Sequence, residues 1–195
     1  MSSVNYDISM SLDGYIQAAN PRPDAPLGVG GEALHDWAMN RDDAAGRDVL
    51  DRGIAGTGAM LCGRATYDDS IRWWQADGPS GQARLPLFVV THTVPSEVPA
   101  GGVYVFVTTG IEDALAQARA AANGKAVSIM GGPAVATQYL RAGLVDEVSI
   151  HLVPVLFGAG TRLTEALPAH IELELTDQLP GPSATHLRYR VKRAS

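Results

Sequence analysis

A short apolar run that ends in two glycines and a proline is the stretch of this chain best suited to chemistry. Residues 126–130 are mostly apolar and predict a buried strand. Gly131, Gly132 and Pro133 follow, and residues 134–141 have a helical composition that tolerates proline in its first turn. A helix that begins after a glycine pair presents free N–H groups to a phosphate. The same residues would also make a plain tight turn, so both interpretations are open at this point.

Two further predicted strands end in turns with phosphate-binding side chains. Residues 59–62 lead into Gly63-Arg64-Ala65-Thr66, and residues 85–90 lead into Thr91-His92-Thr93. Ligands of open α/β sheets bind outside the carboxyl ends of the strands, and a guanidinium matches a phosphate. These turns therefore hold the groups needed for a phosphorylated nucleotide. Arg64 could equally be a surface residue, and Thr91 could only satisfy the amides of its own turn.

Histidines and carboxylates supply the remaining candidates. No histidine has metal-ligand spacing, so we predict no metal site; they are His35, His92, His151, His170 and His186. A carboxyl group beside a bound substrate can orient it or transfer a proton. The candidates near predicted turns and helices are Asp13, Glu32, Asp36, Asp68 and Asp69.

The elements that must position these groups alternate between strands and helices over most of the chain. We predict strands at 4–10, 59–62, 85–90, 103–107, 126–130 and 145–155, and helices at 32–39, 42–54, 111–122 and 134–141, with a further helix through Trp73 and Trp74. Residues 17–31 form a long loop in this prediction, and Asp42 and Thr109 are predicted helix caps. Residues 171–179 and 185–191 alternate around a Pro-Gly-Pro turn and predict an antiparallel hairpin. The order predicts one α/β domain over residues 1–195, with a mostly parallel sheet and antiparallel strands at its C-terminal edge.

The composition excludes several classes of protein. The chain has 195 residues, of which 46% are hydrophobic and 18% charged, and its net charge is −6. These values fit a globular protein, and the absence of a Lys/Arg-rich run argues against a nucleic-acid partner. The single cysteine, Cys62, excludes an internal disulfide. We see no signal peptide and no membrane-spanning segment, and therefore expect a cytoplasmic protein.

Several motifs together resemble the dihydrofolate reductase-like family, and within it the reductase domain of the bifunctional riboflavin-biosynthesis deaminase/reductase. The resemblance extends from about Val4 to Val191. The motifs that carry it are Ser11-Leu12-Asp13-Gly14-Tyr15-Ile16, Cys62-Gly63-Arg64-Ala65-Thr66-Tyr67, Met130-Gly131-Gly132-Pro133, Leu144-Val145-Asp146-Glu147-Val148 and Pro154-Val155-Leu156-Phe157-Gly158-Ala159-Gly160. The resemblance implies a three-layer αβα fold and an NADPH site.

The resemblance also implies roles for individual residues. It implies that the turn and helix start at Met130, Gly131, Gly132, Pro133, Ala134 and Val135 contact the cofactor pyrophosphate. It implies that Arg64 binds the adenosine 2′-phosphate, that Gly63 and Thr66 lie near the phosphates, and that Thr91 and His92 lie toward the adenosine. Ile16 would contact the cofactor, and Ile8 and Met10 would approach the nicotinamide and the substrate.

Dihydrofolate reductases carry a substrate-binding carboxylate on the helix after the first loop. By that resemblance Glu32 is a predicted substrate-binding residue, and Asp36 joins Asp13 as a predicted catalytic residue. The riboflavin reductases carry a basic residue near the end of their first strand and an Asp-Asp-Pro motif after the second. Asp68-Asp69 is the nearest equivalent here, without the proline, and the zinc-binding deaminase domain is absent.

These observations predict an NADPH-dependent reductase of a small heterocyclic substrate. The leading substrate is the pyrimidine of riboflavin biosynthesis, 5-amino-6-(5-phosphoribosylamino)uracil. The alternatives are a dihydrofolate reductase-like activity on a pterin, a non-catalytic NADPH-binding protein, and a domain that binds no nucleotide. We also expect a homodimer, formed through the antiparallel tail and the apolar strand at 148–156.

Overall fold

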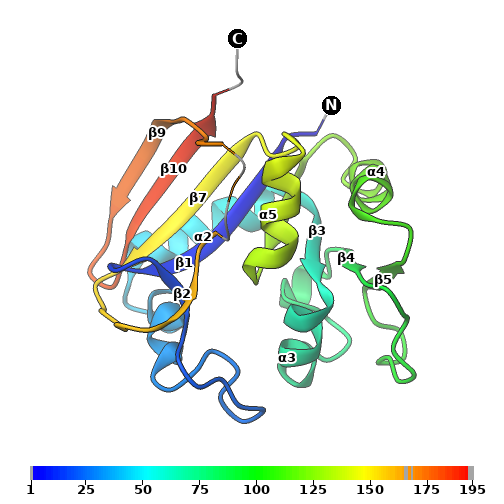
Figure 1. The fold of residues 1–195 in the computed structure, drawn as a ribbon, viewed down its shortest axis with the longest axis horizontal. Helices are drawn as coiled ribbons and strands as arrows, with labels where there is room; N and C mark the ends of the chain where they lie inside the picture. The colour runs from blue at the N-terminus through cyan, green and yellow to red at the C-terminus, as the bar shows by residue number, and fades with distance from the viewer. Residues whose placement is uncertain (1, 165–166, 168, 193–195) are drawn as a thin grey trace.

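The computed structural model describes residues 2–164, 167 and 169–192, and an eight-stranded sheet runs through its centre (Figure 1). The strand order is β5-β4-β3-β6-β1-β7-β10-β9. The first six strands in this order are parallel, and β10 runs antiparallel to both β7 and β9. The strands are β1 (Val4–Ser11), β3 (Thr57–Gly63), β4 (Leu87–Val90), β5 (Tyr104–Val107), β6 (Ala126–Met130), β7 (Glu147–Val153), β9 (Leu173–Pro180) and β10 (Thr185–Val191). The predicted fold class is confirmed.

Helices cover both faces of the sheet and make a three-layer αβα arrangement. Figure 1 shows α5 in front of the sheet and α2 behind it. We call the side covered by α4 and α5 the front face, and the side covered by α1, α2 and α3 the back face. The helices are η1 (Gly31–His35), α1 (Asp36–Met39), α2 (Ala44–Gly56), α3 (Arg64–Trp74), η2 (Gly81–Ala83), α4 (Ile111–Ala121) and α5 (Pro133–Arg141).

The core divides along the same two faces. The front cluster joins the sheet to α4 and α5 and includes the fully buried Leu61, Ile129 and Tyr139. The Tyr139 hydroxyl donates to the Ile111 carbonyl at 2.7 Å, which satisfies its buried polar end. The back face has two smaller clusters, one around Trp37 and one around Tyr67. Both faces of the parallel part of the sheet are therefore covered, as a parallel sheet requires.

A second, two-stranded sheet lies where we predicted a loop. β2 (Tyr15–Ala18) pairs antiparallel with β8 (Gly160–Arg162), so the predicted loop over 17–31 is wrong at its start. The four residues of β2 are too few for a periodic pattern, and its partner is far away in the sequence. The predicted helix caps are also wrong. Asp43 caps α2, its Oδ1 accepting from the Gly46 amide at 2.9 Å, and Gly110 precedes α4.

The outer strands decide which edge could pair with a second copy. β7 lies between β1 and β10, so its predicted exposure as an edge is wrong. The two outer strands are β5 and β9, and the side chains of β9 are exposed along nearly its whole length. A homodimer through the antiparallel tail stays a prediction, with β9 as the outer strand of that tail. Across the residues described, no helix has the length and apolar character needed to cross a membrane.

Candidate active site

The strand order reverses beside the carboxyl end of β6. After β1 the chain crosses to β3, and after β6 it crosses in the opposite direction to β7. β6 ends at Met130, which pairs with Asp7, whereas β1 continues to Ser11 and β3 to Gly63. Ligands of open α/β sheets bind at such a topological switch point. We use the term switch point here for the end of β6 and the flanking ends of β1 and β3.

The turn from β6 into α5 contains two glycines, Gly131 and Gly132, whose surroundings differ. Gly131 has a φ of 85°, and an added Cβ would lie 2.3 Å from Thr66 Oγ1. Thr66 Oγ1 accepts the Gly132 amide at 3.0 Å and joins the start of α3 to the start of α5. The space beside Gly132 is open, because an added Cβ would meet only Thr66 Oγ1, at 3.8 Å.

The start of α5 offers hydrogen-bond donors beside that open space. Pro133 is the first residue of the helix and has no N–H to lose. The amides of Ala134 and Val135 lie in the first turn, where helical N–H groups have no intrahelical partner. The glycine turn and these amides form a cradle that a phosphate could enter.

Arg64 follows the end of β3 and places a permanent positive charge near the carboxyl ends of the parallel strands. Gly63 packs so closely on α5 that an added Cβ would lie 2.8 Å from Val135 Cγ2. Arg64 begins α3, and its Nε contacts the two Asp68 carboxylate oxygens at 2.7 and 2.8 Å. Its Nη1 donates to the Thr93 carbonyl at 2.9 Å. The guanidinium is therefore held toward the turn after β4, and its side chain is 34% exposed.

In the turn after β4, the side chain of Thr91 hydrogen-bonds the backbone of the same turn. The buried Thr91 hydroxyl donates to the Thr93 carbonyl at 2.8 Å and accepts the Thr93 amide at 3.3 Å. His92 is exposed in the same turn. The structure therefore brings this turn next to Arg64, and contacts of Thr91 and His92 with a cofactor stay predictions.

Asp13 joins the turn after β1 to the segment that follows β7. Its Oδ1 accepts from Ser11 Oγ at 2.7 Å and from the Phe157 amide at 3.2 Å, and its Oδ2 accepts from the Gly158 amide at 2.7 Å. The Ser11 hydrogen bond and the backbone amides lower the pKa of Asp13 below its ordinary value. These contacts explain a structural role, and its catalytic role stays a prediction.

The other predicted substrate-side residues are spread over four elements, η1, α1, β1 and β2. Glu32 and Asp36 are exposed on η1 and α1, while Leu34 and Trp37 of the same elements are buried against the sheet. Ile8 and Met10 are half-buried on β1 and pack against the front cluster, and Ile16 is buried in β2. The structure does not join Glu32 or Asp36 to the glycine turn, and their roles stay predictions.

Sequence reasoning missed a polar cluster on the back face. Asp7 Oδ1 lies 3.1 Å from His151 Nε2, and His151 Nδ1 lies 2.8 Å from His186 Nδ1. Both histidines are buried, whereas the Asp7 side chain is 41% exposed. The signal in the sequence is the alternation of Asn5, Asp7, Ser9 and Ser11, which puts polar side chains on one face of a central strand.

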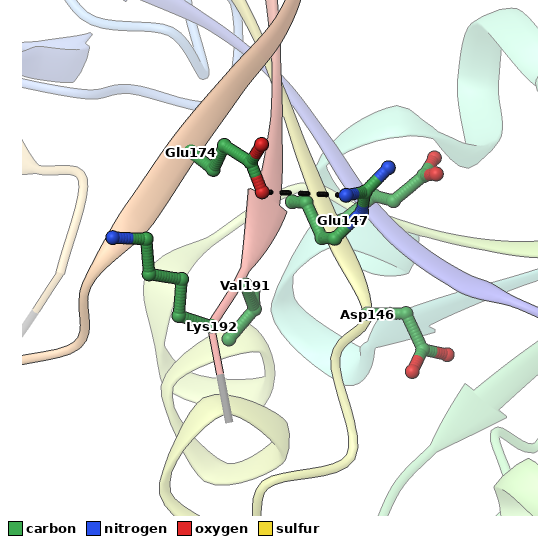
Figure 2. A pocket seen from close by; sticks show the side chains of 6 residues that line it. Asp146, Glu147, Glu174, Val191 and Lys192 are labelled. Carbon is green, nitrogen blue, oxygen red and sulfur yellow. Dashed lines mark hydrogen bonds and ion pairs between the residues drawn. The ribbon is translucent and has the colours of Figure 1, made fainter. Parts of the chain in front are cut away.

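Two surface hollows lie at opposite ends of the sheet. One of about 510 Å³ lies between the first loop and α3 and is lined by Gln17, Pro21, Arg22, Pro23, Pro26, Asp68, Asp69 and Arg72. The other, of about 640 Å³, lies at the amino end of β7 and is shown in Figure 2. Its charged walls include the Arg190–Glu174 ion pair at 3.3 Å. Only the first adjoins Asp68, the ion-pair partner of Arg64.

The sheet order, the glycine turn at the switch point and the two helix layers define an α/β protein of the dihydrofolate reductase-like fold. A family model described as the RibD C-terminal domain matches residues 2–186, and the chain belongs to that family. Among the described residues, no three His, Cys, Asp or Glu side chains form a group that could hold a metal ion. A search of curated proteins found no match.

Solved structures share this fold at low sequence identity. A "putative riboflavin biosynthesis protein" from Shewanella sp. PV-4 is 24% identical, with a TM-score of 0.70, and the match covers 98% of this chain and 99% of that one. The deaminase/5-amino-6-(5-phosphoribosylamino)uracil reductase of Thermotoga maritima is 12% identical, with a TM-score of 0.64; 98% of this chain matches 57% of that one. Enterococcus faecalis dihydrofolate reductase, complexed with NADP(H), is 15% identical, with a TM-score of 0.60 and coverage of 98% and 97%.

Proposed function

We propose that this chain is an NADPH-dependent reductase of a small heterocyclic substrate. The leading substrate is the pyrimidine of riboflavin biosynthesis, and the alternative is a dihydropterin. Membership of the RibD C-terminal domain family supports the reductase class. The observation that carries the proposal is the glycine cradle at the switch point, where Gly131, Gly132 and the start of α5 leave room for an anion.

The cradle fits a dinucleotide diphosphate on physical grounds. The positive φ of Gly131 turns the chain sharply, and the absence of a side chain at Gly132 keeps the approach to the backbone open. The amides of Ala134 and Val135 and the dipole of α5 would bind the pyrophosphate. Thr66 fixes the turn through the Gly132 amide, so the donors are positioned before a ligand arrives.

Arg64 would bind the phosphate that distinguishes NADPH from NADH. Its Nη2 is left without a protein partner in the part of the chain that the structure describes, and its Nε and Nη1 are held by Asp68 and Thr93. A guanidinium that is already oriented loses less entropy when it binds an anion. Thr91 and His92, in the neighbouring turn, would lie toward the adenosine.

When bound, NADPH supplies the hydride, and this chain supplies orientation and a proton route. Ile8, Met10 and Ile16 would provide an apolar wall that excludes water from the nicotinamide. Asp13, Asp36 and Glu32 are the predicted carboxylates of the substrate side. The sheet fixes β1 between β6 and β7, so the residues at its carboxyl end are held rigidly.

Parallel titrations with NADPH and NADH, followed by tryptophan fluorescence, test the proposal. Arg64→Ala should weaken NADPH about 10- to 100-fold and leave NADH nearly unchanged, because only the charge-assisted bond to the 2′-phosphate is lost. Arg52→Ala is the matched control, since Arg52 forms a similar i,i+4 pair with Asp48 on α2. Equal losses for the two cofactors would refute the 2′-phosphate contact. Turnover assays with the pyrimidine and with dihydrofolate then separate the two substrates.

A further inference from the structure

Arg64 lies where a helix disfavours a positive charge. It is the first residue of α3, and the first turn of this helix contains no acidic residue. The partial charge at a helix N-terminus is positive, so a cation there is unfavourable. Asp68 pairs with Arg64 one turn later, and this order, with the cation nearer the N-terminus, is the weaker arrangement of an i,i+4 pair. The stability of α3 therefore does not explain the pair, which points to a ligand outside the helix.

Asp68 occupies only one edge of the Arg64 guanidinium. The Arg64 Nε lies 2.7 and 2.8 Å from the two carboxylate oxygens, and Nη1 donates to the Thr93 carbonyl at 2.9 Å. A guanidinium bonds a carboxylate most strongly through two parallel N–H bonds, which this contact lacks. Two of the five N–H donors of Arg64 are therefore used within the described residues, and the other three can bond an anion.

Asp68 keeps a negative charge that reaches beyond the pair. Its side chain is 49% exposed, and it lines the hollow of about 510 Å³ between the first loop and α3. Burial raises the pKa of Tyr67 and of Asp69, and the charge of Asp68 adds to both shifts. A ligand that enters beside Arg64 would therefore also meet the negative charge of Asp68.

The two members of the pair suit two different groups on the ribose of a dinucleotide. A phosphate ester carries nearly two negative charges at neutral pH, so a guanidinium attracts it and a carboxylate repels it. A ribose hydroxyl is a hydrogen-bond donor, and a carboxylate is the usual partner of the 2′-hydroxyl in dinucleotide-binding folds that take NAD. Arg64 therefore favours NADPH, and Asp68 favours NADH.

We infer that Asp68 is a specificity-determining residue that limits the preference of this chain for NADPH over NADH. This inference rests on the proposed function and concerns its cofactor site. Arg64 attracts the 2′-phosphate of NADPH, while Asp68 repels it and accepts the 2′-hydroxyl of NADH. Because both charges lie at one exposed place and oppose each other, the wild type should prefer NADPH by less than about 10-fold.

The first test compares NADPH and NADH titrations of the wild type and Asp68→Asn. Trp73 and Trp74 lie on the same helix and supply the fluorescence signal. The amide of Asp68→Asn retains an oxygen that can accept the Nε–H of the arginine and lacks the charge. It should tighten NADPH about 3- to 10-fold and not tighten NADH, because only the phosphate is repelled by the carboxylate. Asp48→Asn is the matched control, since Asp48 forms the i,i+4 pair with Arg52 on α2 and should change neither affinity.

The second test separates the charge of Asp68 from a purely structural role. If Asp68 served only to orient Arg64, Asp68→Asn and Asp68→Ala would weaken NADPH, which is the opposite sign. A gain that comes from charge should also shrink as the salt concentration rises, because exposed charges are screened. Circular dichroism checks that each variant is folded. Adenosine 2′-monophosphate and adenosine, titrated in the same way, isolate the 2′-phosphate from the rest of the cofactor.

The outcomes separate this inference from the proposed function. A higher preference for NADPH in Asp68→Asn, with no change in Asp48→Asn, supports the role of Asp68. An unchanged or lower preference overturns that role and leaves the proposed reductase intact. If neither dinucleotide binds the wild type, the proposed cofactor site fails, and the titrations with adenosine 2′-monophosphate still decide the role of Asp68. Tighter binding of that nucleotide to Asp68→Asn than to the wild type supports the role, and equal, weaker or absent binding overturns it.

Discussion

Replacing Gly131 with alanine tests the central turn of the proposed cofactor site. The added Cβ would lie 2.3 Å from Thr66 Oγ1, 2.4 Å from its Cγ2 and 2.8 Å from its Cβ, so Thr66 must move. A non-glycine residue at a φ of 85° costs about 1–2 kcal/mol. Displacement of Thr66 also breaks its bond to the Gly132 amide, worth about 0.5–1.5 kcal/mol. We expect the free energy of unfolding to fall by about 2–3 kcal/mol.

Urea unfolding of Gly131→Ala, Thr66→Ala and the double variant separates the backbone cost at position 131 from the cost of the lost Thr66–Gly132 hydrogen bond. Thr66→Ala alone should cost about 1 kcal/mol, because it removes only the hydrogen bond. In the double variant that bond is already lost and the two closest contacts are relieved, so its total loss should be smaller than the sum by about 1 kcal/mol. NADPH affinity should fall in both single variants. Strictly additive losses, or no loss in Gly131→Ala, would refute the packing argument.

Three further changes probe other parts of this edge. Gly63→Ala should destabilise the protein by about 1–3 kcal/mol in urea unfolding, because Val135 cannot retreat easily, and Val135→Ala should restore part of the loss. Asp13→Asn should weaken the hydrogen bond from the Gly158 amide and speed the hydrogen exchange of that amide. Exchange at the wild-type rate would argue against the structural role of Asp13. His186 has a lowered pKa, so the unfolded chain takes up a proton first as the pH falls below 6.5. The melting temperature should therefore fall between pH 7 and 5 more steeply than in His186→Gln, and parallel curves would contradict this.

Local chemistry explains why the turn at β6 could be predicted. Glycine and proline act through their own backbone, so Gly131, Gly132 and Pro133 predict a strand, a turn and a helix start without any knowledge of the fold. The structure confirms this order, with β6 ending at Met130 and α5 beginning at Pro133. The mostly parallel sheet with antiparallel strands at its C-terminal edge followed from the alternation of strands and helices and the hairpin after it.

Contacts between distant segments could not be predicted in the same way. Asp7 and His151 are 144 residues apart, and their contact depends on the parallel register of β1 and β7. β2 and β8 pair across a similar separation, and neither is long enough for its own pattern. The sequence alone therefore offered Asp13, Glu32, Asp36, Asp68 and Asp69 as carboxylates, and only the folded sheet shows Asp7 against His151.

The placement of the first and last strands has a practical consequence for joining this chain to others. β1 begins and β10 ends at the edge of the sheet opposite the switch point, as the upper end of Figure 1 shows. A second domain or a tag attached at either side would extend away from the glycine turn and Asp7. We therefore expect a fusion at either end to leave the turn between β6 and α5 uncovered.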